Sequence, residues 1–278
     1  MSVRIIVDST ADLMPEVKSR MHVVPLTVHF AEAEYVDGVT ITHKAFYEKL
    51  VECDTLPTTS QATPEAFAAQ FRAATEAGDT AVVITIASQL SGTCQSAMIA
   101  AADFEGIYVV DSSTAAIGTG ILAELALGLA DSGMDAATIA ATLEKEKQNI
   151  RVVALLDTLE YLKKGGRISR AVAFAGGVLN IKPVVSIVDG QICMLGKARG
   201  SRQGNNLLVS EIEKAGGVDF SKPILLGYTG LSDALLQKYM EDSKALWSEV
   251  DHLPWTIIGS VIGTHAGPGA VAVAFFKK

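Results

Sequence analysis

The sequence has few cysteines, a deficit of positive charge and no long uncharged hydrophobic run. Its three cysteines, Cys53, Cys94 and Cys193, lie far apart and form no C-x-x-C pair. This spacing excludes a disulfide framework and indicates a reducing compartment. The nearest approach to a membrane span, Ile117–Ala130, is shorter than the ~18 apolar residues required and contains Glu124. Because the first residues also lack the layout of a signal peptide, the sequence predicts a cytoplasmic protein.

The low content of positive charge argues against a nucleic-acid partner. The chain has 23 Lys and Arg against 31 Asp and Glu, and its net charge is −8. Proteins that bind nucleic acid usually carry a basic balance or a basic stripe, so nucleic acid is disfavoured as a partner. No phosphate-binding loop, lipase-type serine motif or zinc-protease motif occurs. His22, His29, His43 and His252 have no metal-ligand spacing, and we therefore expect no metal and no cofactor.

Apolar residues, by contrast, make up 49% of the chain. Val3–Val7, Ala81–Ala87 and Ile107–Val110 are continuous apolar runs, which are typical of strands covered on both faces. Thr63 and Pro64 mark the start of a helix between two of these runs. The alternation of strands and helices predicts an N-terminal α/β domain over residues 1–150, with a parallel sheet covered by helices.

The pattern changes after residue 150. Asp189-Gly190 stands between the apolar runs Pro183–Val188 and Ile192–Leu195, which predicts a β-hairpin. Further strands are expected at Ile224–Tyr228, Trp255–Ile258 and Ala270–Phe276. Residues 151–278 are therefore expected to form a C-terminal α+β domain with a mixed sheet, packed directly on the first domain. The predicted fold class of the whole chain is α/β.

The stretch from Ala81 to Ala97 combines a buried strand with a hydroxyl-rich loop that opens a helix. In open α/β sheets, ligands bind at the carboxyl ends of the strands. The free amide groups and the dipole of a helix N-terminus favour an anion there. Ser91 and Thr93 offer two hydroxyl donors, and Gly92 lets a ligand approach the backbone. The simpler interpretation is that Ser91 or Thr93 only caps the helix, and this stretch alone leaves both open.

Two other polar features are candidates for the same site. The loop Pro57–Gln61 carries the hydroxyls of Thr59 and Ser60, although by itself it is typical of an ordinary solvated turn. His265 precedes a Gly-Pro-Gly turn that could present the imidazole to a cleft, although a lone histidine is more often structural. In addition, Asp8-Ser9-Thr10 and Asp111–Thr114 end two strands with similar hydroxyl-bearing turns.

One apparent motif is rejected and one basic set stays open. Gly118–Ala123 matches the dinucleotide pattern G-x-G-x-x-A, but the preceding strand ends near Asp111, so these glycines are expected inside a helix, where they serve close packing. Basic residues gather from Lys163 to Arg170 and again at Lys182, Lys197, Arg199 and Arg202. They are either solvated charge or a docking face for an acidic or phosphate-bearing partner.

Taken in order, these motifs resemble the DegV family of bacterial fatty-acid-binding proteins. The resemblance covers nearly the whole chain, and each motif is modest alone, whereas the ordered set is specific. The matching stretches are Asp8–Thr10, Pro57–Gln61, Leu90–Thr93, Asp157–Ser169, Lys182-Pro183 and His265–Gly269. One departure is Ala62, where the family often has proline.

The resemblance implies a carrier of a long-chain fatty acid such as palmitate, without catalytic residues of its own. The carboxylate would be held by Thr59 and Ser91, with His265 nearby, and Ser60, Gly92 and Thr93 belong to the same expected ligand-binding loops. The family also implies that a separate ATP-dependent fatty acid kinase converts the bound fatty acid to an acyl phosphate for phospholipid synthesis. Arg167, Arg199 and Arg202 are the expected contacts for that kinase. A transient membrane contact is a further expectation.

Two other functions remain as alternatives. In the first, the chain is an enzyme acting on a small anionic metabolite, with His265 as general acid or base. In the second, it is a regulatory or scaffold protein whose ligand is only structural. A tail-sized apolar volume would favour the carrier, whereas a compact polar pocket with paired carboxylates would favour the enzyme. The sequence shows hydroxyls and one histidine with no obvious acidic pair beside them, which favours binding.

Overall fold

The computed structural model describes residues 2–168 and 180–278, so the predicted basic and family-motif positions Ser169 and Arg170 lie outside the described residues. The strands are β1 (Val3–Asp8), β2 (His22–Val24), β3 (Thr27–Phe30), β4 (Ala33–Val36), β5 (Thr58–Ser60), β6 (Thr80–Thr85), β7 (Ile107–Asp111), β8 (Ile150–Leu155), β9 (Ile181–Val188), β10 (Gln191–Arg199), β11 (Leu225–Tyr228), β12 (Trp255–Ile257) and β13 (Val271–Phe276). The helices are α1 (Pro15–Lys18), α2 (His43–Glu52), α3 (Pro64–Glu76), α4 (Thr93–Ala101), α5 (Ile117–Asp131), α6 (Ala136–Glu146), α7 (Glu160–Lys164), α8 (Gly200–Lys214), α9 (Ala234–Asp242) and α10 (Ser260–Ala266), with a short 3₁₀ helix at Lys147–Asn149.

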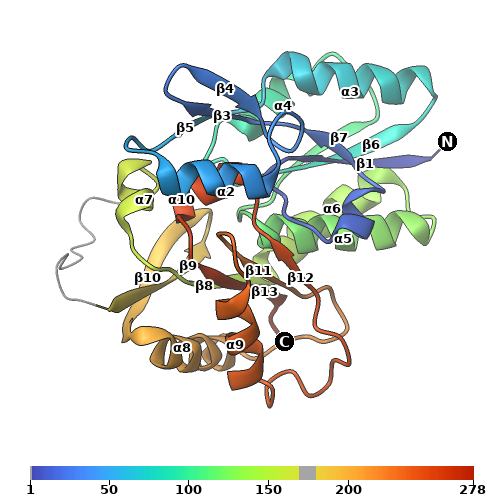
Figure 1. Ribbon diagram of the computed structural model, residues 1–278. Coiled ribbons are helices and arrows are strands. Elements are labelled where there is room, and N and C mark those ends of the chain that lie inside the picture. The colour runs from blue at the N-terminus through green and yellow to red at the C-terminus, as the bar shows by residue number, and fades with distance from the viewer. Residues whose placement is uncertain (1, 169–179) are drawn as a thin grey trace.

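The first sheet is parallel and has the strand order β2-β1-β6-β7, with helices on both faces (Figure 1). Successive residues of β6 point to opposite faces, as the pleat of a strand requires. Val83 therefore packs with Phe67 and Phe71 of α3, whereas Ile84 packs with Ile121 of α5. This arrangement confirms the predicted parallel sheet, but the expected burial on both faces is wrong for β7, which is an edge strand with Tyr108 exposed.

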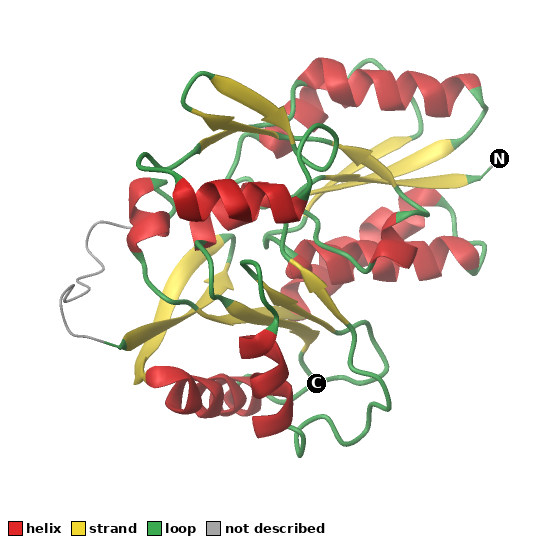
Figure 2. Ribbon diagram, in the orientation of Figure 1, coloured by secondary structure: helices red, strands yellow, loops and turns green. Residues whose placement is uncertain are grey.

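The second sheet is mixed, with the order β10-β9-β8-β13-β11-β12. In Figure 2 it lies below the first sheet, with the red helices α8 and α9 on its lower face. Asp189 and Gly190 form the tip of the β9–β10 hairpin, with φ angles of 49° and 74°. The predicted hairpin and the predicted α/β class with a mixed sheet in the C-terminal part are therefore confirmed.

Helix α5 lies between the two sheets. Its Ile117 and Ile121 belong to one hydrophobic cluster with Val7 of β1 and Val152 of β8. A Cβ atom at Gly120 would overlap the carbonyl oxygen of Asp12, so this position requires glycine for the close approach. The glycines of the rejected dinucleotide pattern thus serve helix packing, as predicted. The predicted domain boundary after residue 150 falls at the start of β8, and it stays a prediction.

A small antiparallel sheet, β4-β3-β5, lies beside α2 and α10. Here the structure corrects the predicted loop at Pro57–Gln61 and gives the element that contains His265. Thr59 lies in β5, where it pairs with Val28 of β3, and His265 lies in the last turn of α10. Helix α10 begins after Gly259, which has no side chain to cap it, so the usual sequence signal for a helix start is missing.

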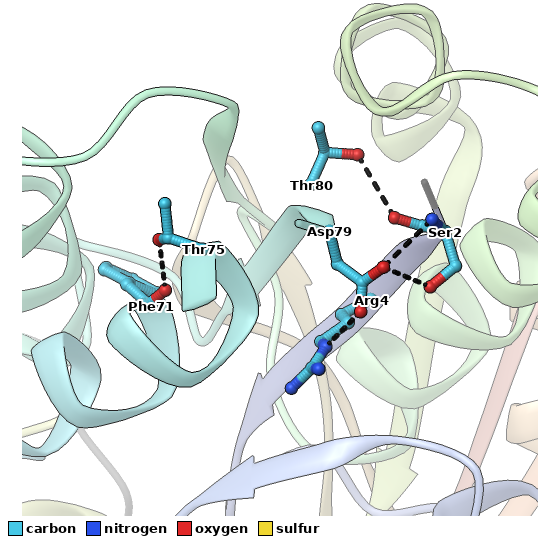
Figure 3. A network of polar contacts seen from close by, with 6 residues as sticks. All are labelled: Ser2, Arg4, Phe71, Thr75, Asp79 and Thr80. Carbon is cyan, nitrogen blue, oxygen red and sulfur yellow. Dashed lines mark hydrogen bonds and ion pairs between the residues drawn. The ribbon is translucent and has the colours of Figure 1, made fainter. Parts of the chain in front are cut away.

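A polar network ties the amino ends of β1 and β6 together, away from their carboxyl ends (Figure 3). Asp79 accepts hydrogen bonds from the backbone N–H and the hydroxyl of Ser2, at 3.0 and 2.7 Å, and from Nε of Arg4 at 2.9 Å. The Ser2 donors, followed by Arg4, lower the pKa of Asp79 to about 2. These ionic and hydrogen bonds tie the N-terminal end of β1 to the residue that precedes β6.

Among residues 2–168 and 180–278, no helix has both the length and the apolar character needed to cross a membrane.

Candidate functional site

A cavity of about 370 Å³ lies between the carboxyl ends of the first sheet and the inner face of the second. Its volume is within the range of small-molecule sites. The wall is mainly apolar, with aliphatic side chains from both sheets and from α10. Examples are Ile86, Val152, Ala154, Ile187, Val261 and Ala272. Such a wall suits an aliphatic ligand rather than a strongly polar one.

Most of the polar side chains on the wall come from elements of the first half of the chain, from α10 and from the segment after α7. Thr59 and Ser60 come from β5, Ser91 from the loop before α4, His265 from α10, and Arg167 from the segment after α7. These residues are far apart in the sequence, and the fold brings them to the same cavity. Of the predicted ligand-binding residues, Thr59, Ser60, Ser91, Gly92 and His265 line it, whereas Thr93 does not.

Thr59 and His265 contact each other directly. Nε2 of His265 lies 2.9 Å from Oγ1 of Thr59. Burial, and then the nearby charge of Arg167, lower the pKa of His265 to about 4, so the imidazole is neutral at pH 7. A neutral ring that carries its hydrogen on Nε2 donates to Thr59 and leaves the threonine hydroxyl hydrogen free for another acceptor. The other ring nitrogen, Nδ1, is buried and has no partner among the described residues.

Ser91 is supported by Thr93 at the start of α4. Oγ of Ser91 lies 2.9 Å from Oγ1 of Thr93 and accepts a hydrogen bond from the Thr93 backbone N–H at 3.3 Å. If the Thr93 hydroxyl also donates to Ser91, the Ser91 hydroxyl hydrogen can point into the cavity. Thr93 is fully buried, so it supports Ser91 from behind the cavity wall.

Gly92 and Gln61 pack tightly at the same place. A Cβ atom at Gly92 would overlap Oε1 of Gln61. Nε2 of Gln61 in turn donates to the hydroxyl of Ser96 on α4 at 2.8 Å. A side chain at position 92 would displace the amide of Gln61, which links the segment after β5 to α4 through Ser96.

Arg167 supplies positive charge at the cavity, which the sequence did not predict. Its Nε donates to the carbonyl oxygen of Leu90 at 3.2 Å, and its Nη1 donates to that of Gly165 at 2.6 Å. No carboxylate of the described residues forms an ion pair with it. The sequence placed Arg167 with Arg199 and Arg202 on a docking face. The structure puts Arg167 on the cavity wall, whereas the exposed Arg199 and Arg202 lie at the junction of β10 and α8.

Several cavity residues were missed at the sequence level. Gln61 was recognised only as part of a motif, and Leu26, Ala115 and Ala116 carried no local signal. For Arg167 the only signal was its position after the pair Gly165-Gly166. Gly165 packs so closely on His265 that a Cβ atom would overlap Nδ1 of the ring. A basic residue two positions after this glycine, in Gly165-Gly166-Arg167, was the signal available.

The residues of the cavity wall bear on the choice between a fatty-acid carrier and an enzyme that acts on a small anionic metabolite. None of the described residues that line the cavity is Asp or Glu. The paired carboxylates that would favour an enzyme are thus not found on this wall. Within the part of the chain that the structure describes, no group of three or more His, Cys, Asp or Glu is arranged to hold a metal ion.

Comparisons with known proteins agree over the full length. The family described as "Uncharacterised protein, DegV family" matches residues 2–278. A DegV domain-containing protein of Caldanaerobacter subterraneus subsp. tengcongensis is 33% identical over 99% of both chains. The structure of a fatty-acid-binding DegV family protein from Thermus thermophilus has a TM-score of 0.90 and 32% identity, and 100% of each chain is covered. The Streptococcus pneumoniae fatty acid kinase (Fak) B3 protein, loaded with linoleic acid, shares the fold, with a TM-score of 0.87, 22% identity and 100% of each chain covered.

Proposed function

Because this chain belongs to the DegV family, we propose that it binds one long-chain fatty acid in the cavity between its two sheets. The observation that carries the proposal is the cavity itself, an apolar chamber of about 370 Å³ whose wall also carries the polar side chains of Thr59, Ser91 and His265. The fatty-acid binding of the Thermus thermophilus relative, which is 32% identical, supports it. The protein acts in this proposal as a carrier rather than as a catalyst.

The carboxylate binds where the donors converge. Thr59 and Ser91 each direct a hydroxyl hydrogen to it, and the backbone amides at the N-terminus of α4 add a favourable dipole. Each such hydrogen bond to a charged acceptor contributes about 1.5–3 kcal/mol. Arg167 adds a full positive charge to the same region. Neutral donors together with one arginine satisfy a carboxylate without a metal ion.

The aliphatic wall holds the tail. Burying ~12 methylene groups contributes on the order of 10 kcal/mol before the costs of association are subtracted. Most of the affinity therefore comes from the tail, and the head-group donors set the orientation. They keep the carboxylate beside His265, at the end of the ligand that a second protein has to reach.

We propose further that the bound fatty acid is presented to a separate ATP-dependent kinase, which forms the acyl phosphate used in phospholipid synthesis. The family resemblance suggests this partner, and the fold shared with the B3 protein is compatible with it. The exposed Arg199 and Arg202 are the proposed contacts, because the planar guanidinium pairs bidentately with carboxylates.

Native mass spectrometry tests the central proposal. The purified chain should carry, or after delipidation take up, one fatty acid of 16 to 18 carbons, a length that follows from the family resemblance. Protein that stays free of lipid after incubation with palmitate would contradict the proposal.

Two variants then test the head-group site. Thr59→Val and Ser91→Ala should each weaken palmitate binding by about 1.5–3 kcal/mol, because each removes one donor to a charged acceptor. Thr58→Val is the matched control, since Thr58 precedes Thr59 on β5 and does not line the cavity. Unchanged palmitate affinity in both variants and in the double variant would mean that the carboxylate binds elsewhere.

A further inference from the structure

The sequence contains a repeated turn to which the proposed site assigns no role. Asp8-Ser9-Thr10 begins at the last residue of β1, and Asp111–Thr114 begins at the last residue of β7. Each aspartate closes its own turn, because Asp8 accepts from the Thr10 backbone N–H at 2.9 Å and Asp111 accepts from that of Ser113 at 2.8 Å. Aspartate commonly closes turns in this way, so these two bonds alone indicate only local structure.

The order of the strands gives the two turns a common neighbour. Strand β6 lies between β1 and β7, so the turns flank the loop that follows β6 on either side. This loop, residues 86–92, carries the proposed head-group donor Ser91 and is called the Ser91 loop below. The turns therefore lie at the carboxyl edge of the sheet, next to the chain that forms the site.

Three consecutive amides of the Ser91 loop donate to the flanking turns. The N–H of Ile86 donates to Oδ2 of Asp8 at 2.7 Å. The N–H of Ala87 donates to the carbonyl oxygen of Thr114 at 2.8 Å. The N–H of Ser88 donates to the carboxylate of Asp111, with distances of 3.2 and 3.3 Å to its two oxygens. The start of the loop is thus held from both sides.

The rest of the loop depends on this start. The N–H groups of Leu90 and Ser91 both donate to the carbonyl oxygen of Ala87, at 2.9 and 3.2 Å. Ala87 is the residue held between the two aspartates. On the far side, Nζ of Lys147 donates to the carbonyl oxygen of Asp111 at 2.9 Å, which fixes the backbone of that turn. Both aspartates therefore hold the neighbours of Ala87, and the carbonyl oxygen of Ala87 in turn holds the backbone of Ser91.

We propose that Asp8 and Asp111 are positioning residues, which hold the Ser91 loop in the one conformation that directs the Ser91 hydroxyl at the fatty acid carboxylate. The proposal rests on the proposed function of Ser91. Neither aspartate lines the cavity, so both act through the loop. A loop that is already ordered in the free protein loses little conformational entropy when the ligand binds, and this raises the affinity.

The expected effect is specific to the head group. Loss of the hydrogen bonds from one of the two aspartates to the Ser91 loop should lower palmitate affinity about 3- to 10-fold, the equivalent of one net hydrogen bond. Of the Ser91 loop, Ile86 and Leu90 also line the cavity, but most of the tail-binding wall comes from both sheets and α10, so tail binding should change little. Hexadecanol has the same tail without a carboxylate, and its affinity should change by less than about twofold.

Asp111 is the better position for the test, because Asp8 is completely buried and its replacement threatens the fold. Asp111→Ala removes the acceptor. Asp111→Asn keeps Oδ1, which accepts from the backbone N–H groups of Ser88 and Ser113. The asparagine variant should therefore retain most of the palmitate affinity. Asp219→Ala is the matched control. Asp219 accepts from the Ser221 backbone N–H at 3.1 Å in the same kind of turn, but it is not bonded to the Ser91 loop.

The measurements are dissociation constants of palmitate and hexadecanol for these variants, alone and combined with Ser91→Ala. We expect Asp111→Ala to change only palmitate affinity, and to add nothing once Ser91 is already alanine. Equal losses for both ligands, or a loss that adds fully to that of Ser91→Ala, would overturn the positioning role. If Ser91→Ala itself leaves palmitate affinity intact while the wild type binds palmitate, Ser91 is not a head-group donor and the positioning role fails, although fatty-acid binding itself stands.

Discussion

His265 offers the most direct test of the electrostatics of the site. Burial lowers the pKa of its imidazole to about 4 in the folded protein, against about 6.5 in the unfolded chain. Between these two values the unfolded chain binds a proton that the folded protein does not. Stability therefore decreases as the pH falls from 6.5 towards 4, and changes no further below that window.

The magnitude follows from the two pKa values. Lowering the pH from 7.5 to 5 should remove about 2 kcal/mol of unfolding free energy through this one group. His265→Gln removes the titration and keeps an amide donor that can reach Thr59. Asp12, whose pKa burial raises to about 8, and His43, whose pKa burial lowers, also titrate, but they do so equally in both proteins. The difference between wild type and variant therefore isolates His265.

The assay is urea unfolding of the delipidated proteins at both pH values. We expect the stability advantage of the wild type over His265→Gln to shrink by about 2 kcal/mol at pH 5. The palmitate-loaded wild type should lose less, because a carboxylate beside the ring raises the pKa of His265. An identical pH response in wild type and variant would refute the reasoning, since His265 would then titrate as a solvated histidine and could not be assumed neutral beside Thr59.

Other predictions separate the arginines and the tail wall. Arg167→Met should weaken palmitate binding by about 1.5–3 kcal/mol and leave hexadecanol unchanged, and equal loss of both ligands would show that it only shapes the cavity. The double variant Arg199→Ala/Arg202→Ala should leave palmitate binding intact and reduce phosphorylation by the cognate kinase, as raised salt should for the wild type. A parallel loss of palmitate binding would place the two arginines in the ligand site. Ala154→Leu should disfavour long chains over short ones at about 0.8 kcal/mol per displaced methylene, and an unchanged chain-length profile would exclude Ala154 from the tail wall.

Local chemistry made much of the fold predictable. Thr63 was expected to mark the start of a helix, and its hydroxyl accepts the capping hydrogen bond from the Ala66 backbone N–H. The Asp189-Gly190 turn likewise needs left-handed backbone at both residues, which this pair readily adopts. In each case the determining contact lies within a few residues, so the sequence pattern carries it.

The predictions failed for elements that depend on contacts with residues far away in the sequence. Strand β5 exists because Thr59 pairs with Val28 across about thirty residues, and three polar residues alone carry no strand signal. Helix α10 packs on α2 from the other end of the chain. Thr59, Ser91 and His265 could be named through the family resemblance, and the structure brings them to one cavity, while their contact with a carboxylate stays a prediction. The position of Arg167 depends on how α7 packs against α10, which no local pattern encodes.

The position of α5 between the sheets has a consequence for the kinetics of ligand exchange. Ile117, Ile121 and Leu122 are fully buried in a cluster that includes residues of both sheets. Swinging the sheets apart would expose these side chains, at about 1.5–3 kcal/mol each, together with their partners on the strands. That total approaches the stability of a whole domain, so hinge opening would be as rare as unfolding. On the proposed function, fatty acid would therefore enter and leave by local rearrangement at the rim of the cavity, and its exchange rate should not follow the global unfolding rate.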